Sequence, residues 1–314
     1  MTASRSILAA ADDRLDRAIV NAMPELSRSQ VRRLIEEGGV RLDGRVVDRP
    51  AAAVAAGARI EVVEPVIPDL DLAARAVPLD ILYEDEETLV INKQPGLVVH
   101  PRAGMHAVTL INAVRARYPA VREIDESDRG GIVHRLDRDT SGAIALAKSE
   151  AAQYSMKEQW RLRETLKIYV ALVEGSVAPP EGIIDAPLGA DPTDPSRRAV
   201  VERGQSARTQ YRVIEQYGDD YALVQVRIFT GRTHQIRVHM QAVGHPVVGD
   251  HTYGRTSPII GRQALHAARL GFTLASNGAW REFEAPLPED MRSAIDELRA
   301  RYHVQPVEQQ VYSR

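Results

Sequence analysis

Residues beyond about position 80 contain many short β-rich runs, and these runs restrict the fold more than any other feature. Most of them are bounded by turns, and only a few stretches between them have a helical pattern. Strands that far outnumber helices favour an antiparallel sheet flanked by helices over a doubly wound parallel sheet. The sequence therefore predicts an α+β fold with a mostly antiparallel, mixed β-sheet. The expected strands are 87–93, 143–149, 167–175, 209–216 and 221–229, and the expected helices are 109–118, 150–162, 233–243 and 288–301.

A change in composition divides the chain. Residues 12–64 have the pattern of a compact helix-helix-hairpin unit. Residues 65–79 contain three prolines and no clear period, which is typical of a linker. We therefore expect a small N-terminal domain at 12–64, a linker at 65–79 and a larger domain at 80–305.

The N-terminal unit has recognisable start and turn signals. Ser27 and Gln30 form a capping box that opens an amphipathic helix, and Asp43-Gly44 predicts a tight hairpin turn. A clustered set of arginines is expected on its outer surface, on the second helix and the hairpin. These are Arg28, Arg32, Arg33, Arg41 and Arg45. Charge alone does not separate a ligand-binding surface from an ordinary solvated helix face.

Composition excludes several classes of function. The chain has no cysteine, which removes disulfides, thiol nucleophiles and thiolate metal sites. No phosphate-binding loop, dinucleotide fingerprint, nucleophile elbow or metal-ligand spacing occurs, so we predict neither a cofactor nor a metal. No run approaches the length of a membrane span, and we expect a cytoplasmic protein. The net charge of −3 does not by itself indicate a nucleic-acid partner.

The segment GGIVHRLDRDTSG, residues 130–142, gathers charges between glycines and is expected to lie beside a ligand at a sheet end. Asp137 and Asp139 are alternate residues with different neighbours to pair with, and we expect one of them to face inward. An aspartate flanked by Arg135 and Arg138 is also consistent with a structural ion pair. This segment alone leaves both interpretations open.

Two further segments complete the set. Arg232 is predicted at a strand-to-helix corner, where Thr233 caps the helix and free backbone N–H groups favour an anion. Tyr169 interrupts an apolar strand and fits either a core position or a site. One aspartate, one tyrosine and several arginines suit chemistry at a sugar carbon or a base ring without a cofactor.

Six motifs in this order resemble the RluA/RluD family of pseudouridine synthases, over about residues 80–300. The N-terminal unit resembles the alpha-L RNA-binding domain of the ribosomal protein S-four kind. The motifs are GGIVHRLDRDTSGAIALAKS, KIYVALVEG, TGRTHQIRVHM, GHPVVGDHTYG, RQALHAARLGF and FEAPLP.

The resemblance implies roles for individual residues. Asp137 would be the catalytic aspartate, and Arg232 would pair with it and keep it ionised. Tyr169 would pack on the flipped uracil and help to remove the proton from its carbon 5. Arg135 would fill the space that the target uridine leaves, and His134 beside it would contact RNA. The outward arginines of the N-terminal unit would bind RNA phosphates.

The resemblance also implies the substrate. We expect a monomeric enzyme that converts uridines to pseudouridine in structured RNA, with large-subunit ribosomal RNA as the first candidate. Transfer RNA is the alternative substrate, and a non-catalytic RNA-binding assembly factor is the alternative function. A hydrolase acting on a glycosidic bond is a further rival, although such enzymes usually need a second carboxylate.

Overall fold

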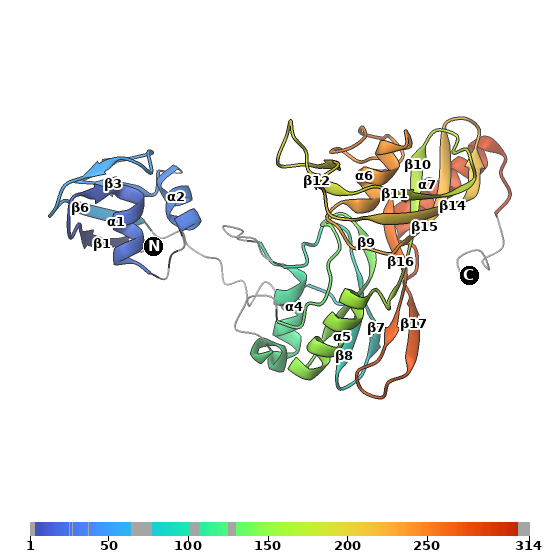
Figure 1. Ribbon diagram of the computed structural model, residues 1–314, viewed down its shortest axis with the longest axis horizontal. Coiled ribbons are helices and arrows are strands. Elements are labelled where there is room, and N and C mark those ends of the chain that lie inside the picture. Colours follow the sequence, from blue (N-terminus) through green and yellow to red (C-terminus); the bar gives the residue numbers. More distant parts are fainter. Residues whose placement is uncertain are drawn as a thin grey trace. The chain divides into compact units, whose positions relative to one another are not determined.

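The chain forms two compact units, each with its own buried core (Figure 1). The structure, a computed structural model, describes residues 4–24, 26, 28–36, 38–63, 77–100, 107–124 and 130–306. Most of the predicted linker at 65–79 lies outside the described residues. Within the described part of the chain, no helix has the length and apolar character to cross a membrane.

The N-terminal unit packs two helices against a small antiparallel sheet with the strand order β1-β6-β3-β4. Leu15, Ile19, Val31 and Ile35 from the helices and Ile60 from the sheet fill its core. The elements are β1 (Ser4–Leu8), β2 (Asp13–Arg14), α1 (Leu15–Ala22), α2 (Arg28–Glu36), β3 (Val40–Leu42), β4 (Arg45–Val46), β5 (Ala53–Val54) and β6 (Arg59–Val63).

Two sequence predictions can be compared with this unit. Asp43 and Gly44 both have positive φ, 47° and 80°, as a two-residue hairpin turn requires, so the predicted turn is confirmed. The expected boundary at residue 12 misses strand β1, which pairs with β6 along its whole length. The predicted capping box lies outside the description, since Ser27 and the side chain of Gln30 are not among the described parts.

The larger unit is built on one bent sheet with the order β11-β14-β15-β10-β16-β9-β8-β7, and β17 also pairs with β16. Every neighbouring pair is antiparallel except β16 and β9, so the predicted fold class is confirmed. Its strands are β7 (Ile81–Glu84), β8 (Thr88–Lys93), β9 (Ser141–Ala147), β10 (Leu166–Glu174), β11 (Glu181–Asp185), β14 (Arg208–Tyr217), β15 (Tyr221–Ile228), β16 (Leu265–Thr273) and β17 (Trp280–Glu284). A separate hairpin is formed by β12 (Leu188–Ala190) and β13 (Arg198–Val200).

The helices of this unit lie near the predicted stretches. They are α4 (Leu110–Arg117), the 3₁₀ turn η1 (Pro119–Glu123), α5 (Glu150–Leu162), α6 (Gln235–Ala242) and α7 (Glu289–Tyr302). Alternation along β9 directs Ile144 and Leu146 to one core and Ala143 and Ala145 to another. Helices α4, α6 and α7 contribute to the first core, and α5 contributes to the second. The sheet is therefore covered on both faces, which explains why β10 is buried from Ile168 to Val173.

Candidate active site

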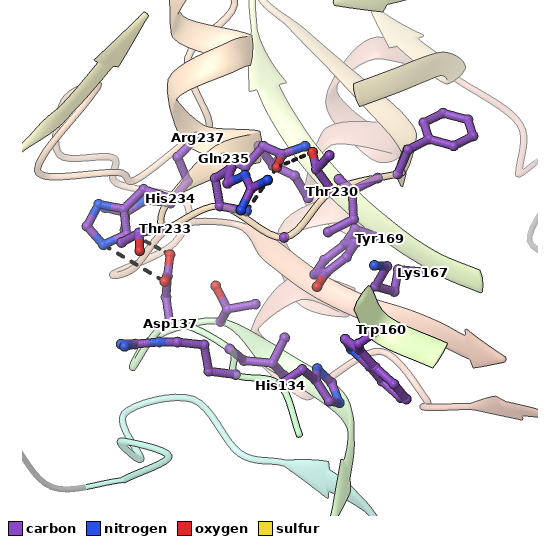
Figure 2. Close-up of a pocket in the computed structure, with 18 of the residues that line it drawn as sticks. His134, Asp137, Trp160, Lys167, Tyr169, Thr230, Thr233, His234, Gln235 and Arg237 are labelled. Atoms are coloured by element: carbon purple, nitrogen blue, oxygen red, sulfur yellow. Dashed lines mark hydrogen bonds and ion pairs between the residues drawn. The ribbon is translucent and has the colours of Figure 1, made fainter. Parts of the chain in front are cut away.

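A pocket of about 420 Å³ lies where the loop before β9 meets β10, the end of α5 and the turn before α6 (Figure 2). Asp137 is the only carboxylate among the described residues that line it. Tyr169 lies across the pocket from Asp137, and Lys167 lies beside Tyr169 (Figure 2).

The glycine-rich segment 130–142 is held close to the sheet by its glycines. Gly142 has φ 110°, and a Cβ there would lie 2.3 Å from the carbonyl oxygen of Ala267. Gly131 has φ 79°, and a Cβ there would lie 2.6 Å from the carbonyl oxygen of Ala147. No other residue type fits such a close approach with positive φ.

Two basic side chains, Lys93 and Arg262, fasten the same loop through its carbonyl groups. Lys93 Nζ donates to the carbonyl oxygens of Gln94, Leu97 and Arg138 at 2.8–2.9 Å. Arg262 Nη1 donates to the carbonyl oxygen of Asp139 at 2.9 Å. The loop is thereby fixed by side chains from outside it, which presents Asp137 in a defined position.

The two aspartates of the loop have different environments, as predicted. Asp139 pairs with Arg138, whose side chain is 67% exposed. Asp137 faces the pocket, where it accepts a hydrogen bond from Arg237 Nη1 at 3.1 Å. His234 Nε2 lies 3.9 Å from the other oxygen of Asp137. Asp139 therefore makes the surface ion pair, and Asp137 is the carboxylate available for chemistry.

The prediction that Arg232 pairs with Asp137 is wrong, because Arg237 occupies that position. Arg237 also makes a two-pronged ion pair with Asp250, with Nε donating at 2.6 Å and Nη2 at 2.8 Å. Asp250 is fully buried and also accepts the backbone N–H groups of Thr252 and Tyr253. Burial alone would raise the pKa of Asp250, but Arg237 and these N–H groups lower it overall. One guanidinium thus links a buried carboxylate to the carboxylate in the pocket.

The start of α6 explains the difference between the two arginines. The helix begins at Gln235, and its N-cap is His234 in the left-handed conformation, so the predicted Thr233 cap is also wrong. Gln235 Oε1 accepts hydrogen bonds from the Thr230 hydroxyl and the Arg232 backbone N–H. These contacts wind 230–234 into a tight loop, and Arg232 Nε donates to the Ser206 carbonyl instead of to Asp137.

The strand β10 supplies the remaining polar groups. Burial, with a smaller contribution from the charge of Asp137, raises the pKa of Tyr169, so its phenol is protonated at neutral pH. Burial, with a smaller contribution from the charge of Arg163, lowers the pKa of Lys167 to about 8. Sequence reasoning missed Lys167, although its place two residues before Tyr169 puts both side chains on one face of the strand.

Comparisons with known proteins identify the family. Residues 87–242 match the RNA pseudouridylate synthase profile, and residues 13–60 match the S4 domain. An uncharacterized RNA pseudouridine synthase of Chloroflexus aurantiacus is 49% identical over 296 residues, 93% of this chain and 92% of that protein. The ribosomal large subunit pseudouridine synthase D of Pasteurella multocida is 38% identical over 305 residues, 93% of each chain. The structure of human RNA pseudouridylate synthase domain containing 1 matches with a TM-score of 0.57 and 28% identity, over 78% of this chain and 99% of that chain.

The chain belongs to the RNA pseudouridine synthase family. The family resemblance predicted from the motifs is confirmed. The protein is therefore an isomerase with pseudouridine synthase activity on RNA, and its N-terminal unit is an S4 domain.

The side chain of His134 lines the pocket of this synthase and is uncharged. Its Nε2 accepts the backbone N–H of Ala145 at 2.9 Å, and its ring stacks on Trp160 with the centroids 4.9 Å apart. Burial, with a smaller contribution from the charge of Lys167, lowers the pKa of His134 to about 3. His134 therefore offers RNA no positive charge at neutral pH, whereas its neighbour Arg135 is exposed and lines the same pocket.

The predicted arginines of the S4 domain are exposed where the structure describes them. These are Arg28, Arg32, Arg41 and Arg45. Arg32 makes only a loose contact with Glu36 at 4.0 Å, and the side chain of Arg33 is not among the described parts. Exposure leaves these arginines available to a ligand, and their contact with RNA stays a prediction. In the described part of the chain, no group of three or more His, Asp or Glu side chains is placed to hold a metal ion.

Proposed function

We propose that Asp137 is the catalytic residue and that the substrate is uridine in large-subunit ribosomal RNA. The single observation that carries this proposal is the position of Asp137, facing the pocket and fixed by Arg237, with Tyr169 opposite. The substrate class is supported by the names of similar proteins, among them the large-subunit enzyme of Pasteurella multocida.

The reaction needs one carboxylate, a base-sized space and exclusion of water. The bond from uracil N1 to ribose C1′ breaks, the uracil turns over, and C5 bonds to C1′ while the C5 proton leaves and N1 gains one. The atoms balance without a redox partner. Both fragments must stay bound between the two bond changes, and a pocket lined by Asp137, Tyr169 and Trp160 can hold a flipped base.

Each neighbour of Asp137 has a proposed role in this scheme. Arg237 holds the carboxylate oriented toward the ribose, and Asp250 fixes Arg237 from behind. Tyr169 is a neutral phenol whose ring packs on the uracil, and because it is protonated at neutral pH it does not itself take the C5 proton, which leaves to solvent. Arg135 fills the gap in the RNA stack, since it is exposed at the pocket. The S4 domain contributes affinity through phosphate contacts.

The absence of a second carboxylate among the described pocket-lining residues speaks against a glycosidic hydrolase, whose usual mechanism needs an acid and a base or nucleophile. The proposal also includes a monomer, because each unit buries its own core. It further includes a cytoplasmic location, as the sequence predicts.

Release of tritium from RNA labelled at uridine C5 tests the proposal. We expect release from large-subunit ribosomal RNA and not from transfer RNA, and complete loss in Asp137→Asn. Asp139→Asn is the matched control, because it removes a carboxylate from the same loop. The ion-pair partner of Asp139 is the exposed Arg138, so this variant should retain activity. Release from transfer RNA alone would refute the substrate, and equal activity of Asp137→Asn and wild type would refute the catalytic role. Binding of RNA without release from either RNA would favour the assembly-factor alternative.

A further inference from the structure

A second, smaller hollow of about 230 Å³ lies next to the catalytic pocket and has no role so far. It is formed between the β12–β13 hairpin and the loop before α6. Arg232 and Thr233 line both cavities, so the two lie next to each other. Arg198, Arg203 and Gln205 complete its polar lining, and none of the described residues that line it is acidic.

The arginines of this hollow differ from several others in the domain, which have carboxylate partners. Arg138, Arg161, Arg262 and Arg299 each have a carboxylate within ion-pair distance. Within the described residues, Arg198, Arg203 and Arg232 form no such pair, and the Arg232 Nε donates only to a carbonyl oxygen. The chain has 43 acidic residues against 40 lysines and arginines, so three arginines without an acid in one hollow form a local excess of positive charge.

The β12–β13 hairpin and the turn after it, which carry Arg198 and Arg203, are fixed in place. A Cβ at Gly204 would lie 2.7 Å from the backbone of Leu188, so only glycine fits at this position. Leu188 packs with Ala207, Val238 of α6 and Tyr253 in a small core of its own. The hollow is therefore built on a supported element and not on a loose loop.

Tyr253 connects this hairpin to the proposed catalytic group. Its hydroxyl accepts the backbone N–H of Arg198 at 2.9 Å and also lies 2.9 Å from Nδ1 of His234. The guanidinium of Arg237 lies over its ring at 5.0 Å. A ligand group in the hollow would therefore lie beside the elements that fix Asp137.

The chemistry of the lining restricts the ligand. Guanidinium groups without carboxylate partners favour phosphate, which they bind through paired hydrogen bonds. None of the described lining residues is aromatic, so the hollow offers no surface on which a base would stack. A phosphodiester group fits this lining better than a nucleobase does.

We propose that this hollow binds the backbone phosphate of RNA next to the target uridine, through Arg198, Arg203 and Arg232. The inference rests on the proposed function in placing that uridine in the pocket with Asp137. Because Arg232 and Thr233 line both cavities, a phosphate flanking that uridine would lie at the hollow. In this arrangement Arg232 contacts substrate backbone and does not support the catalytic carboxylate.

The test compares the double variant Arg198→Gln/Arg203→Gln with wild type in binding to a large-subunit ribosomal RNA transcript at several salt concentrations. Both side chains are exposed, so the variant should fold. We expect binding weaker by about tenfold or more at low salt, and a slope of log K against log salt that is shallower by about 1.5, the value for two lost phosphate contacts.

The matched control is Arg292→Gln/Arg301→Gln on α7, which removes the same net charge from exposed arginines that pair with glutamates of their own helix. An equal loss of affinity and slope in both double variants would show a general charge effect and overturn the inference. An unchanged slope in the Arg198→Gln/Arg203→Gln variant would overturn it as well. Because the readout is binding, failure of Asp137→Asn to abolish turnover would refute the proposed function without affecting this result.

Discussion

Replacing Arg237 by methionine should destabilise the synthase strongly and nearly abolish its turnover. The substitution removes three side-chain hydrogen bonds, two to Asp250 and one to Asp137, and leaves the fully buried Asp250 carboxylate without a cation. Removal of one partner from a buried ion pair costs about 3–5 kcal/mol of the free energy of unfolding. Loss of the fixed position of Asp137 should lower kcat by roughly 100-fold.

Urea unfolding at pH 7 gives the stability change, and Arg232→Met is the matched control. Arg232 lines the same pocket, but its side chain donates to one carbonyl group, so its loss should cost about 1 kcal/mol or less. In the double variant Arg237→Met/Asp250→Asn, the buried charge is gone and an oxygen remains for the N–H groups of Thr252 and Tyr253. It should be more stable than Arg237→Met alone. The reasoning is refuted if Arg237→Met and Arg232→Met lose the same stability.

Two further predictions concern buried titratable groups. Lys167→Met should raise the free energy of unfolding at pH 7 by about 3 kcal/mol, because burial lowers the pKa of Lys167 from 10.5 to about 8 and disfavours its charged form. The gain should shrink from pH 8 to 10.5, because the folded protein loses the lysine proton at a lower pH than the unfolded chain does. Denaturant unfolding from pH 7 to 10.5 tests this. A Lys167→Met variant less stable than wild type at pH 7 would contradict the idea. Burial lowers the pKa of His134 to about 3 and the pKa of His266 to about 4. Both imidazoles therefore stay neutral in the folded chain at pH 5, whereas in the unfolded chain they take up protons below pH 6.5. Together they should cost about 3 kcal/mol of stability between pH 6.5 and 5, and NMR titration of either ring with a midpoint near 6.5 would disprove this.

The strands were predictable because their signals are local. The run 167–175 is apolar and β-branched, and it forms the central strand β10 within one residue of the expected position. The sequence also predicted that one of Asp137 and Asp139 faces inward, and the choice of Asp137 came from the family resemblance. The short strand β1 was missed because its five residues gain stability only from pairing with β6, more than 50 residues later in the chain.

The partner of Asp137 was beyond prediction for a different reason. Successive residues of a helix point about 100° apart, so the identity of the inward arginine depends on where α6 begins. That start is set by hydrogen bonds of Gln235 and by the left-handed His234, neither of which has a sequence signal at this site. Asp250 and Lys93 were missed because their roles exist only through contacts with distant segments.

The single parallel pairing in the sheet, between β9 and β16, determines when the pocket is formed during synthesis. Parallel strands begin at the same edge, so the loop with Asp137 before β9 and the segment from Asp250 to Arg262 before β16 meet there (Figure 1). Ser141 pairs with His266, 125 residues away, and Arg262 reaches back to the carbonyl of Asp139. Contacts so distant in sequence form late in folding. A nascent chain therefore cannot complete the pocket until strand β16 has been synthesised.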